Sequence, residues 1–288
     1  MKNLKLFIQL SRLDKPIGYM LLFWPCLWGL TIAYNFENNL NTYFFYLFLF
    51  FLGSVFMRSA GCIMNDIVDK NFDNKVDRTK NRPIASGKIS ISFGIFYIII
   101  LCLSALLVLL QFNYLTIILA LASMPLAFTY PLMKRFTYWP QLFLGITFNY
   151  GLLLGWTSIN EQINLAPLVL YLGAIFWTLG YDAIYGYQDI KDDQIIGIKS
   201  TSIKFKNNPK KFLTLCYLIT IASFIYTGIL MNFNTIFFIL LVLPIIHLLI
   251  FQIKKLNVEN PISCLKSFKS NNFFGLIVYI NLIVGKLI

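Results

Sequence analysis

Long apolar runs separated by short polar segments dominate the chain. Each run approaches the roughly 20 apolar residues that a helix needs to cross a bilayer. A chain that crosses a bilayer repeatedly in this way folds as helices, because each helix satisfies its own backbone hydrogen bonds. We therefore predict an all-α, polytopic membrane bundle of about nine transmembrane helices, formed by a single domain over residues 1–288. The predicted helices span about 17–34, 43–64, 89–111, 114–130, 139–158, 165–187, 212–231, 235–253 and 273–288.

The composition strengthens this prediction. Of the 288 residues, 58% are hydrophobic and only 12% are charged, whereas charged residues make up about 25% of an ordinary soluble domain. A disordered chain and an ordinary soluble domain are therefore excluded. The five cysteines lack the paired spacing of a zinc site, so we interpret them as isolated apolar residues.

Basic residues are distributed unevenly between the two sides of the predicted membrane. All of the 24 Lys and Arg except Arg58 and Lys286 lie before the first predicted helix or after the second, fourth, sixth or eighth. By the positive-inside rule, these segments and the N-terminus are cytoplasmic. The net charge of +12 therefore indicates topology rather than nucleic-acid binding. We expect the chemistry in the two longest cytoplasmic segments, roughly 65–88 and 188–211.

Eight of the twelve acidic residues fall into two clusters at these segments. In the first cluster the acids lie at offsets of 0, 3, 7 and 11, which on a helix places them within an arc of about 80°. The second cluster repeats these offsets with a tyrosine at the second position. We therefore predict a weak internal repeat, with a stripe of carboxylates along one helix face. The positions are Asp66, Asp69, Asp73 and Asp77, and then Asp182, Tyr185, Asp189 and Asp193.

Such stripes need cations, because carboxylates at this spacing repel one another and are costly near a membrane. Mg²⁺ is the favoured partner, since it prefers carboxylate oxygens and keeps positions for water and substrate phosphates. Separate arginine and lysine side chains match phosphate oxygens, so the combination indicates diphosphate binding. Two alternatives remain open: a solvated helix end in which Lys70 and Lys75 balance the acids, and basic residues that only set topology.

The acidic clusters and their flanks resemble a known family. Residues 65–73 resemble the N-D-x-x-D-x-x-x-D signature of the UbiA superfamily of intramembrane prenyltransferases, and residues 182–193 resemble its second aspartate motif. Gly186 stands where an alanine is usual, and Asp77 lies outside the motif. The flanks that resemble the 4-hydroxybenzoate polyprenyltransferase branch are residues 12–18, 78–83 and 197–201.

The resemblance implies a helical bundle around a central cavity that opens to the cytoplasmic side. It also implies Mg²⁺-dependent transfer of a polyprenyl group from polyprenyl diphosphate to the ring carbon ortho to the hydroxyl of 4-hydroxybenzoate, a membrane step of ubiquinone biosynthesis. The expected setting is the lipid bilayer of a bacterial inner membrane, with no nucleic acid and no obligate protein partner. The expected metal ligands are Asn65, Asp66, Asp69, Asp73, Asp189 and Asp193, and the expected diphosphate-binding residues are Arg78, Arg82, Lys134 and Arg135. The expected catalytic residues are Asp182 and Asp189. The residues expected to bind the aromatic substrate are Arg58, Tyr130 and Tyr185.

Arg58 is the one cation well inside a predicted span. A charge there costs about 2.5–3.5 kcal/mol on insertion scales, so the side chain should face a polar cavity or a fixed partner. It precedes Asn65 by seven residues, about two helical turns, and therefore shares the face of the first motif. We expect its guanidinium to receive the carboxylate of 4-hydroxybenzoate. The alternatives are a structural pair with an acid such as Asp182 and a side chain that snorkels toward the interface.

Three other functions compete with this prediction. The nearest keeps the family and changes the acceptor to dihydroxynaphthoate, protohaem or a chlorophyll precursor. A cation-coupled transporter would place its carboxylates in the middle of broken helices, whereas these acids lie at helix ends beside basic loops. A CDP-alcohol phosphotransferase would begin its motif with D-G-x-x-A-R, which precedes neither cluster.

Overall fold

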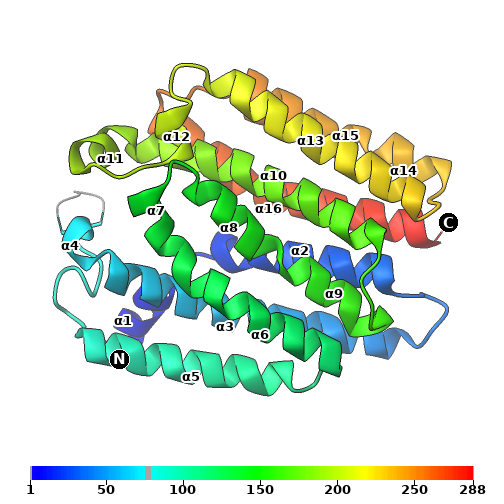
Figure 1. Cartoon of the computed structure of the whole chain (residues 1–288), viewed down its shortest axis with the longest axis horizontal. Coiled ribbons are helices and arrows are strands. Elements are labelled where there is room, and N and C mark those ends of the chain that lie inside the picture. Colours follow the sequence, from blue (N-terminus) through cyan, green and yellow to red (C-terminus); the bar gives the residue numbers. More distant parts are fainter. Residues whose placement is uncertain (1, 75–78, 288) are drawn as a thin grey trace.

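The fold is a bundle of long helices that run roughly along one axis (Figure 1). The computed structural model describes residues 2–74 and 79–287, and within these ranges it contains no β-strand. Eight helical segments are long and apolar enough to cross a membrane, and α2 is a shorter apolar helix of 17 residues. The prediction of an integral membrane bundle of about nine spans is therefore confirmed. The spans are α2 (Ile17–Ala33), α3 (Leu40–Val68), α5 (Ile91–Leu109), α6 (Tyr114–Thr129), α8 and α9 (Pro140–Asn149, Gly151–Asn160), α10 (Leu165–Gly186), α13 (Pro209–Leu230), α14, α15 and η3 (Thr235–Leu240, Val242–Ile246, His247–Lys254) and α16 (Pro261–Leu287).

Short helices gather at one end of the bundle, on the left in Figure 1. They belong to the segments that the sequence places on the cytoplasmic side, including the two long segments expected to carry the chemistry. The fold therefore collects the longer connections between spans at the end where the acidic clusters lie. These elements are α1 (Lys2–Ser11), α4 (Lys70–Asp73), η1 (Tyr130–Leu132), α7 (Met133–Phe136), η2 (Tyr187–Asp189), α11 (Ile190–Ile196) and α12 (Thr201–Lys204).

The ninth span starts twelve residues earlier than the apolar pattern predicts, at Pro261 rather than 273. Proline suits the first turn of a helix, and the Oδ1 atom of Asn260 accepts the backbone N–H of Ile262 at 2.9 Å. Hydropathy missed this first part because it is rich in polar side chains, some of which are paired inside the bundle. The polar residues are Lys266, Ser267, Lys269, Ser270, Asn271 and Asn272.

Close packing of α2 against α9 forms the centre of the bundle. A Cβ atom on Gly29 would lie 2.0 Å from the carbonyl oxygen of Leu152, and one on Gly155 would lie 2.2 Å from that of Cys26. Small residues at these crossings let the two backbones approach, as they do in many membrane helix pairs.

The opposite face of α2 packs on α16. The indole N–H of Trp24 donates to Asn272 Oδ1 at 2.9 Å, and that of Trp28 donates to the carbonyl oxygen of Gly275 at 3.1 Å. Trp28 is fully buried. The first and ninth spans are therefore neighbours, and the bundle is closed by their contact.

A buried polar cluster fixes α10 against the spans that follow it. The Tyr217 hydroxyl donates to Gln252 Oε1 at 2.6 Å, Gln252 Nε2 donates to Asn271 Oδ1 at 2.7 Å, and Trp177 Nε1 donates to the same oxygen at 2.8 Å. Gln252 lies in the π-helical η3, which also brings His247 Nδ1 to 3.3 Å from the Gln252 amide nitrogen. Buried polar side chains that satisfy one another in this way hold helices in one register.

Candidate active site

A polar cavity lies at the end of the bundle where the short helices gather, and both acidic clusters reach it. Its wall is formed by the end of α3, α4, η1, α7, the start of α8, the end of α10, η2, α11 and the residues after it. Sequence-predicted site residues make up half of its lining. They are Asn65, Asp69, Asp73, Arg82, Tyr130, Lys134, Asp182, Tyr185, Asp189 and Asp193.

The first acidic cluster is not a stripe on one helix. Helix α3 ends at Val68, Asp69 adopts φ −95° and ψ 3°, and α4 begins at Lys70. The prediction of one continuous helical face is therefore wrong for this cluster, and Asp77 lies outside the described residues. The Asn- and Asp-rich sequence explains the break, because these side chains compete with the helical backbone for hydrogen bonds.

The second cluster is interrupted in the same manner. Helix α10 ends at Gly186, the short η2 follows, and Asp189 adopts φ −112° and ψ 8° immediately before α11. Asp69 therefore occupies the joint between a spanning helix and a short one, and Asp189 occupies the joint between the two short helices that follow a spanning one. Each joint turns the chain along the wall of the cavity, so that residues before and after it line the same space.

Asp66 lies behind the cavity wall rather than in it. It is fully buried, and its Oδ1 atom accepts hydrogen bonds from Arg12 Nη2 at 2.8 Å and Arg82 Nη1 at 3.2 Å. Arg82 Nη1 also donates to Asp73 Oδ2 at 2.8 Å. Arg82 thus joins two carboxylates of the first cluster, and Arg12 fixes the deeper one from the end of α1.

Asp69 pairs with a cation from a distant part of the chain. Lys134 of α7 donates through Nζ to Asp69 Oδ2. Burial raises the pKa of Asp69, while the ammonium group of Lys134 acts in the opposite direction. Ion pairing of this carboxylate is therefore needed to keep it charged inside the wall.

The carboxylates fit a hard cation such as Mg²⁺. Asp66 Oδ2 and Asp69 Oδ1 are buried, and neither has a hydrogen-bond partner among the residues that the structure describes. Such oxygens are the ligands that Mg²⁺ prefers. Among the described residues no three acidic, histidine or cysteine side chains converge on a single point. Asp66 and Asp69 are instead paired with the chain's own arginines and lysine.

Two of the four predicted diphosphate-binding residues lie on the cavity wall, and one lies outside it. Arg82 and Lys134 line the cavity. Arg135 is exposed; it donates through Nη2 to the carbonyl oxygen of Val68 at 2.9 Å and lies 5.4 Å from the ring centre of Phe72. In this structure Arg135 therefore secures the end of α3. Arg78 lies outside the described residues.

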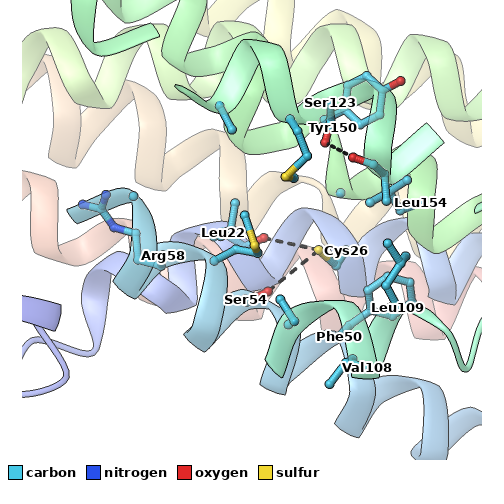
Figure 2. Close-up of a pocket in the computed structure, with 18 of the residues that line it drawn as sticks. Leu22, Cys26, Phe50, Ser54, Arg58, Val108, Leu109, Ser123, Tyr150 and Leu154 are labelled. Carbon is cyan, nitrogen blue, oxygen red and sulfur yellow. Dashed lines mark hydrogen bonds between the residues drawn. The ribbon is translucent and has the colours of Figure 1, made fainter. Parts of the chain in front are cut away.

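A second, apolar cavity adjoins the polar one inside the bundle. Helices α2, α3, α5, α6, α8 and α9 supply its lining, in which Arg58 is the one charged side chain among the described residues. Figure 2 shows Arg58 at one end and Phe50, Val108 and Leu109 at the other. Tyr130 lines both cavities, so the two meet beside it.

Arg58 faces this junction from α3. Its guanidinium lies 5.2 Å from the ring centre of Phe148, and it is close enough to Asp182 for electrostatic attraction. Its Nε atom is buried without a hydrogen-bond partner. A Cβ atom on Gly18 would lie 2.8 Å from that nitrogen, so the glycine leaves room for the guanidinium. The position offers both an acidic neighbour and a free N–H.

Sequence reasoning gave no role to four polar residues that also line the polar cavity: Thr79, Gln141, Lys199 and Ser200. Gln141 lies at the start of α8, and its Oε1 atom accepts the backbone N–H of Thr201 at 2.9 Å. The segment 197–201 had been singled out only as a flank. Contacts with residues about 60 positions earlier in the chain bring this segment to the cavity. A local sequence pattern cannot predict such contacts.

A polar cavity lined by acids and bases, joined to an apolar one within a membrane bundle, defines a membrane enzyme for molecules with a charged head and an apolar tail. Residues 22–277 match the UbiA prenyltransferase family. The chain belongs to this family.

Individual relatives agree over nearly the whole chain. The chain is 40% identical to "4-hydroxybenzoate polyprenyltransferase, mitochondrial" of Caenorhabditis elegans, over 99% of this chain and 80% of that protein. It is 38% identical to "4-hydroxybenzoate geranyltransferase 1" of Lithospermum erythrorhizon, over 99% of this chain and 92% of that protein. The solved structure of a UbiA homolog from Archaeoglobus fulgidus bound to DMAPP and Mg²⁺ superposes with a TM-score of 0.69 and 19% identity, over 97% of both chains, and shows the same fold.

Proposed function

We propose that the protein transfers a polyprenyl group from polyprenyl diphosphate to the ring carbon ortho to the hydroxyl of 4-hydroxybenzoate, in the presence of Mg²⁺, as a membrane step of ubiquinone biosynthesis. The observation that carries the proposal is the meeting of the charged and apolar cavities at Tyr130. The names of the relatives, which specify 4-hydroxybenzoate as the acceptor, support the same reaction.

The polar cavity holds the diphosphate head of the donor. The carboxylates of the two clusters hold the metal, which when bound neutralises the departing diphosphate. Arg82 and Lys134 would bind the remaining phosphate oxygens in place of their present carboxylate partners. The metal ligands in this proposal are the predicted ones that line the cavity, Asn65, Asp69, Asp73, Asp189 and Asp193, while Asp66 holds Arg12 and Arg82 behind the wall.

The apolar cavity holds the prenyl chain and keeps water away from its reactive carbon. The C–O bond between this carbon and the diphosphate breaks, and its electron pair leaves with the diphosphate. The carbon then carries positive charge and would react with water if water could enter. Because apolar side chains line the cavity and exclude water, the carbon reacts with the aromatic acceptor instead.

The acceptor lies where the two cavities meet. The free Nε–H of Arg58 receives the carboxylate of 4-hydroxybenzoate, and Tyr130 and Tyr185 flank its ring. The ring carbon ortho to the hydroxyl bonds to the prenyl carbon and loses its proton. We assign acceptance of this proton to the second acidic cluster, to Asp182 or Asp189, both of which line the polar cavity.

We also propose that the membrane is a bacterial inner membrane, with the N-terminus and the polar cavity on the cytoplasmic side. The support is the concentration of basic residues in the connections at that end of the bundle. Labelling of single engineered cysteines at Asn38 and Ser86 tests this orientation. A membrane-impermeant reagent added to intact cells should label position 38 and spare position 86, and the reverse result would contradict the proposal.

The reaction is tested by incubating purified protein with Mg²⁺, a polyprenyl diphosphate and a panel of aromatic acceptors, with products identified by mass. We expect prenylated 4-hydroxybenzoate. If product forms only with dihydroxynaphthoate, protohaem or a chlorophyll precursor, that compound and not 4-hydroxybenzoate is the acceptor. No product with any acceptor, from protein that is folded and inserted, would refute the activity.

A further inference from the structure

Three cationic side chains line the polar cavity among the described residues: Arg82, Lys134 and Lys199. The first two are committed to carboxylates of the first acidic cluster. Lys199 forms no such ion pair with any described residue. Its Nζ atom donates to the carbonyl oxygen of Phe136 at 3.3 Å and lies 5.7 Å from the ring centre of Tyr138. Lys199 therefore lines the cavity and carries a positive charge that none of the described aspartates pairs with.

The backbone of Lys199 is fixed beside that of Lys134. The N–H of Lys199 donates to the carbonyl oxygen of Lys134 at 2.9 Å. The next two residues are also held: Ser200 Oγ accepts the N–H of Ile203 at 3.2 Å and caps α12, and Thr201 Oγ1 donates to the carbonyl oxygen of Tyr138 at 3.0 Å. The Lys199 side chain thus extends from a rigid loop.

The same loop continues directly from the second acidic cluster. The N–H of Ile198 donates to the carbonyl oxygen of Asp193 at 3.0 Å, and Gly197 makes the turn with φ 78°, which favours glycine. A lysine on one side of this turn and an aspartate on the other both line the polar cavity. A diphosphate held together with a metal would need both kinds of side chain, carboxylates to hold the metal and a cation to bind phosphate oxygens.

We propose that Lys199 binds the donor diphosphate directly, as a third phosphate contact beside Arg82 and Lys134. An ammonium on a flexible four-carbon stem forms strong, charge-assisted hydrogen bonds to phosphate oxygens. Arg82 and Lys134 must exchange a carboxylate for phosphate, whereas Lys199 gives up only a carbonyl contact. The identity of the donor rests on the proposed function. Binding of the diphosphate group by Lys199 can be measured with inorganic diphosphate, without assuming that function.

The competing explanation is structural, because Lys199 Nζ also bonds the last carbonyl of α7, where a positive charge stabilises a helix end. Lys199→Gln and the control Lys204→Gln separate the two roles. Lys204 lies five residues further on in α12, 4.3 Å from the ring centre of Trp139, and does not line the polar cavity. Both variants remove one positive charge from the same segment.

The experiment measures binding of inorganic diphosphate, with Mg²⁺, to the purified protein by calorimetry, together with the thermal midpoint of unfolding. We expect Lys199→Gln to weaken binding about tenfold or more, Lys204→Gln to leave it within about twofold, and Lys199→Arg to retain most of it. In turnover assays Lys199→Gln should raise the KM for the prenyl donor and leave the KM for the aromatic acceptor unchanged.

Equal diphosphate affinity in wild type and Lys199→Gln would overturn the proposal, as would equal weakening by Lys204→Gln. If Lys199→Gln fails to fold, Lys199→Met keeps the aliphatic stem against Tyr138, and unchanged diphosphate affinity in that variant would refute the direct contact. If wild-type protein binds no diphosphate at all, both this inference and the proposed diphosphate site are refuted. If the protein binds diphosphate normally but shows no turnover, the role of Lys199 stands and only the proposed reaction is refuted.

Discussion

The two cavities differ in how the chain builds them. The apolar cavity is walled by regular spanning helices, whose side chains meet because the helices pack side by side. The polar cavity is walled by helix ends, two joints at Asp69 and Asp189, and loops such as 197–201. Charged groups thus collect where spans end and the backbone can turn, while the apolar cavity is lined mainly by residues within the spans.

This difference follows from the cost of charge in a membrane. Ionised side chains are expensive at the bilayer centre and are tolerated toward the interface, where water and opposite charges are present. Arg58 is the exception, since it lies within α3, lines the apolar cavity and has a buried Nε atom. Changes in the polar cavity should therefore affect every donor alike, whereas changes in the apolar cavity should depend on the length of the prenyl chain.

The strongest test of this comparison is removal of Asp69 or Asp189, the aspartates at the two joints. We expect Asp69→Ala and Asp189→Ala each to lower kcat by about 10²–10³-fold, because the leaving diphosphate loses its charge stabilisation. The loss should be the same with short and long donors. Asp14→Ala, at an exposed position, serves as the control. Near-normal turnover in both variants, or full turnover in a chelator, would refute a metal role for the acidic clusters.

A smaller effect is expected from Arg82→Gln. Loss of a charged hydrogen bond to phosphate should raise the donor KM by about 10–100-fold at every chain length. Arg82 also joins Asp66 and Asp73, so the thermal midpoint is measured alongside. Lys88→Gln, which removes a charge from an exposed site on the same cytoplasmic segment, should change neither quantity. An unchanged donor KM and kcat would show that Arg82 does not bind the diphosphate.

Arg58→Leu probes the boundary between the cavities. We expect the KM for the aromatic acceptor to rise about tenfold, because the acceptor's carboxylate loses a charged partner, while the donor KM changes less than about twofold. Steady-state kinetics with each substrate varied in turn gives both values. Equal effects on the two substrates, or loss of folded protein alone, would favour a structural pair with Asp182.

The smallest effect should come from the far end of the apolar cavity. Phe112 lines that cavity and packs against Phe50, with ring centres 4.8 Å apart. Phe112→Ala should favour donors one isoprene unit longer, by about fourfold for one further CH₂ group that the enlarged cavity buries, since each buried CH₂ contributes about 0.8 kcal/mol. The control Phe44→Ala removes a ring that is 58% exposed on α3. A length preference identical to that of wild type would argue that the chain does not reach Phe112.

The spans could be predicted from the sequence because hydropathy is a local property summed over about 20 residues. The same locality explains the errors at helix ends. The first turns of α16 carry Lys266 and Lys269 and were excluded, although α16 includes them. The joint at Asp69 was not predicted because the spacing of the acids also fits one continuous helix, whereas α3 ends at Val68.

The candidate site was predictable in its chemistry and less so in its geometry. Aspartates, Arg82 and Lys134 were identified from charge and spacing, and they meet in one cavity. Arg135 was grouped with its neighbour Lys134, yet adjacent residues on a short helix point in different directions, and Arg135 bonds the end of α3. Lys199 was assigned no role because its place beside Lys134 follows from a contact across 65 positions of sequence.

The contact between α2 and α16 has a consequence for biosynthesis. Trp24 and Trp28 enter the membrane with the first span, but their hydrogen-bond partners lie 248 and 247 residues later in the chain. A ribosome adds about 5–20 residues per second, so these indole groups wait about ten seconds or more for α16 to be made. During that interval α2 lacks one of its neighbours, and a nascent chain that stops short of α16 leaves two indole N–H groups without the partners that they have in the complete bundle.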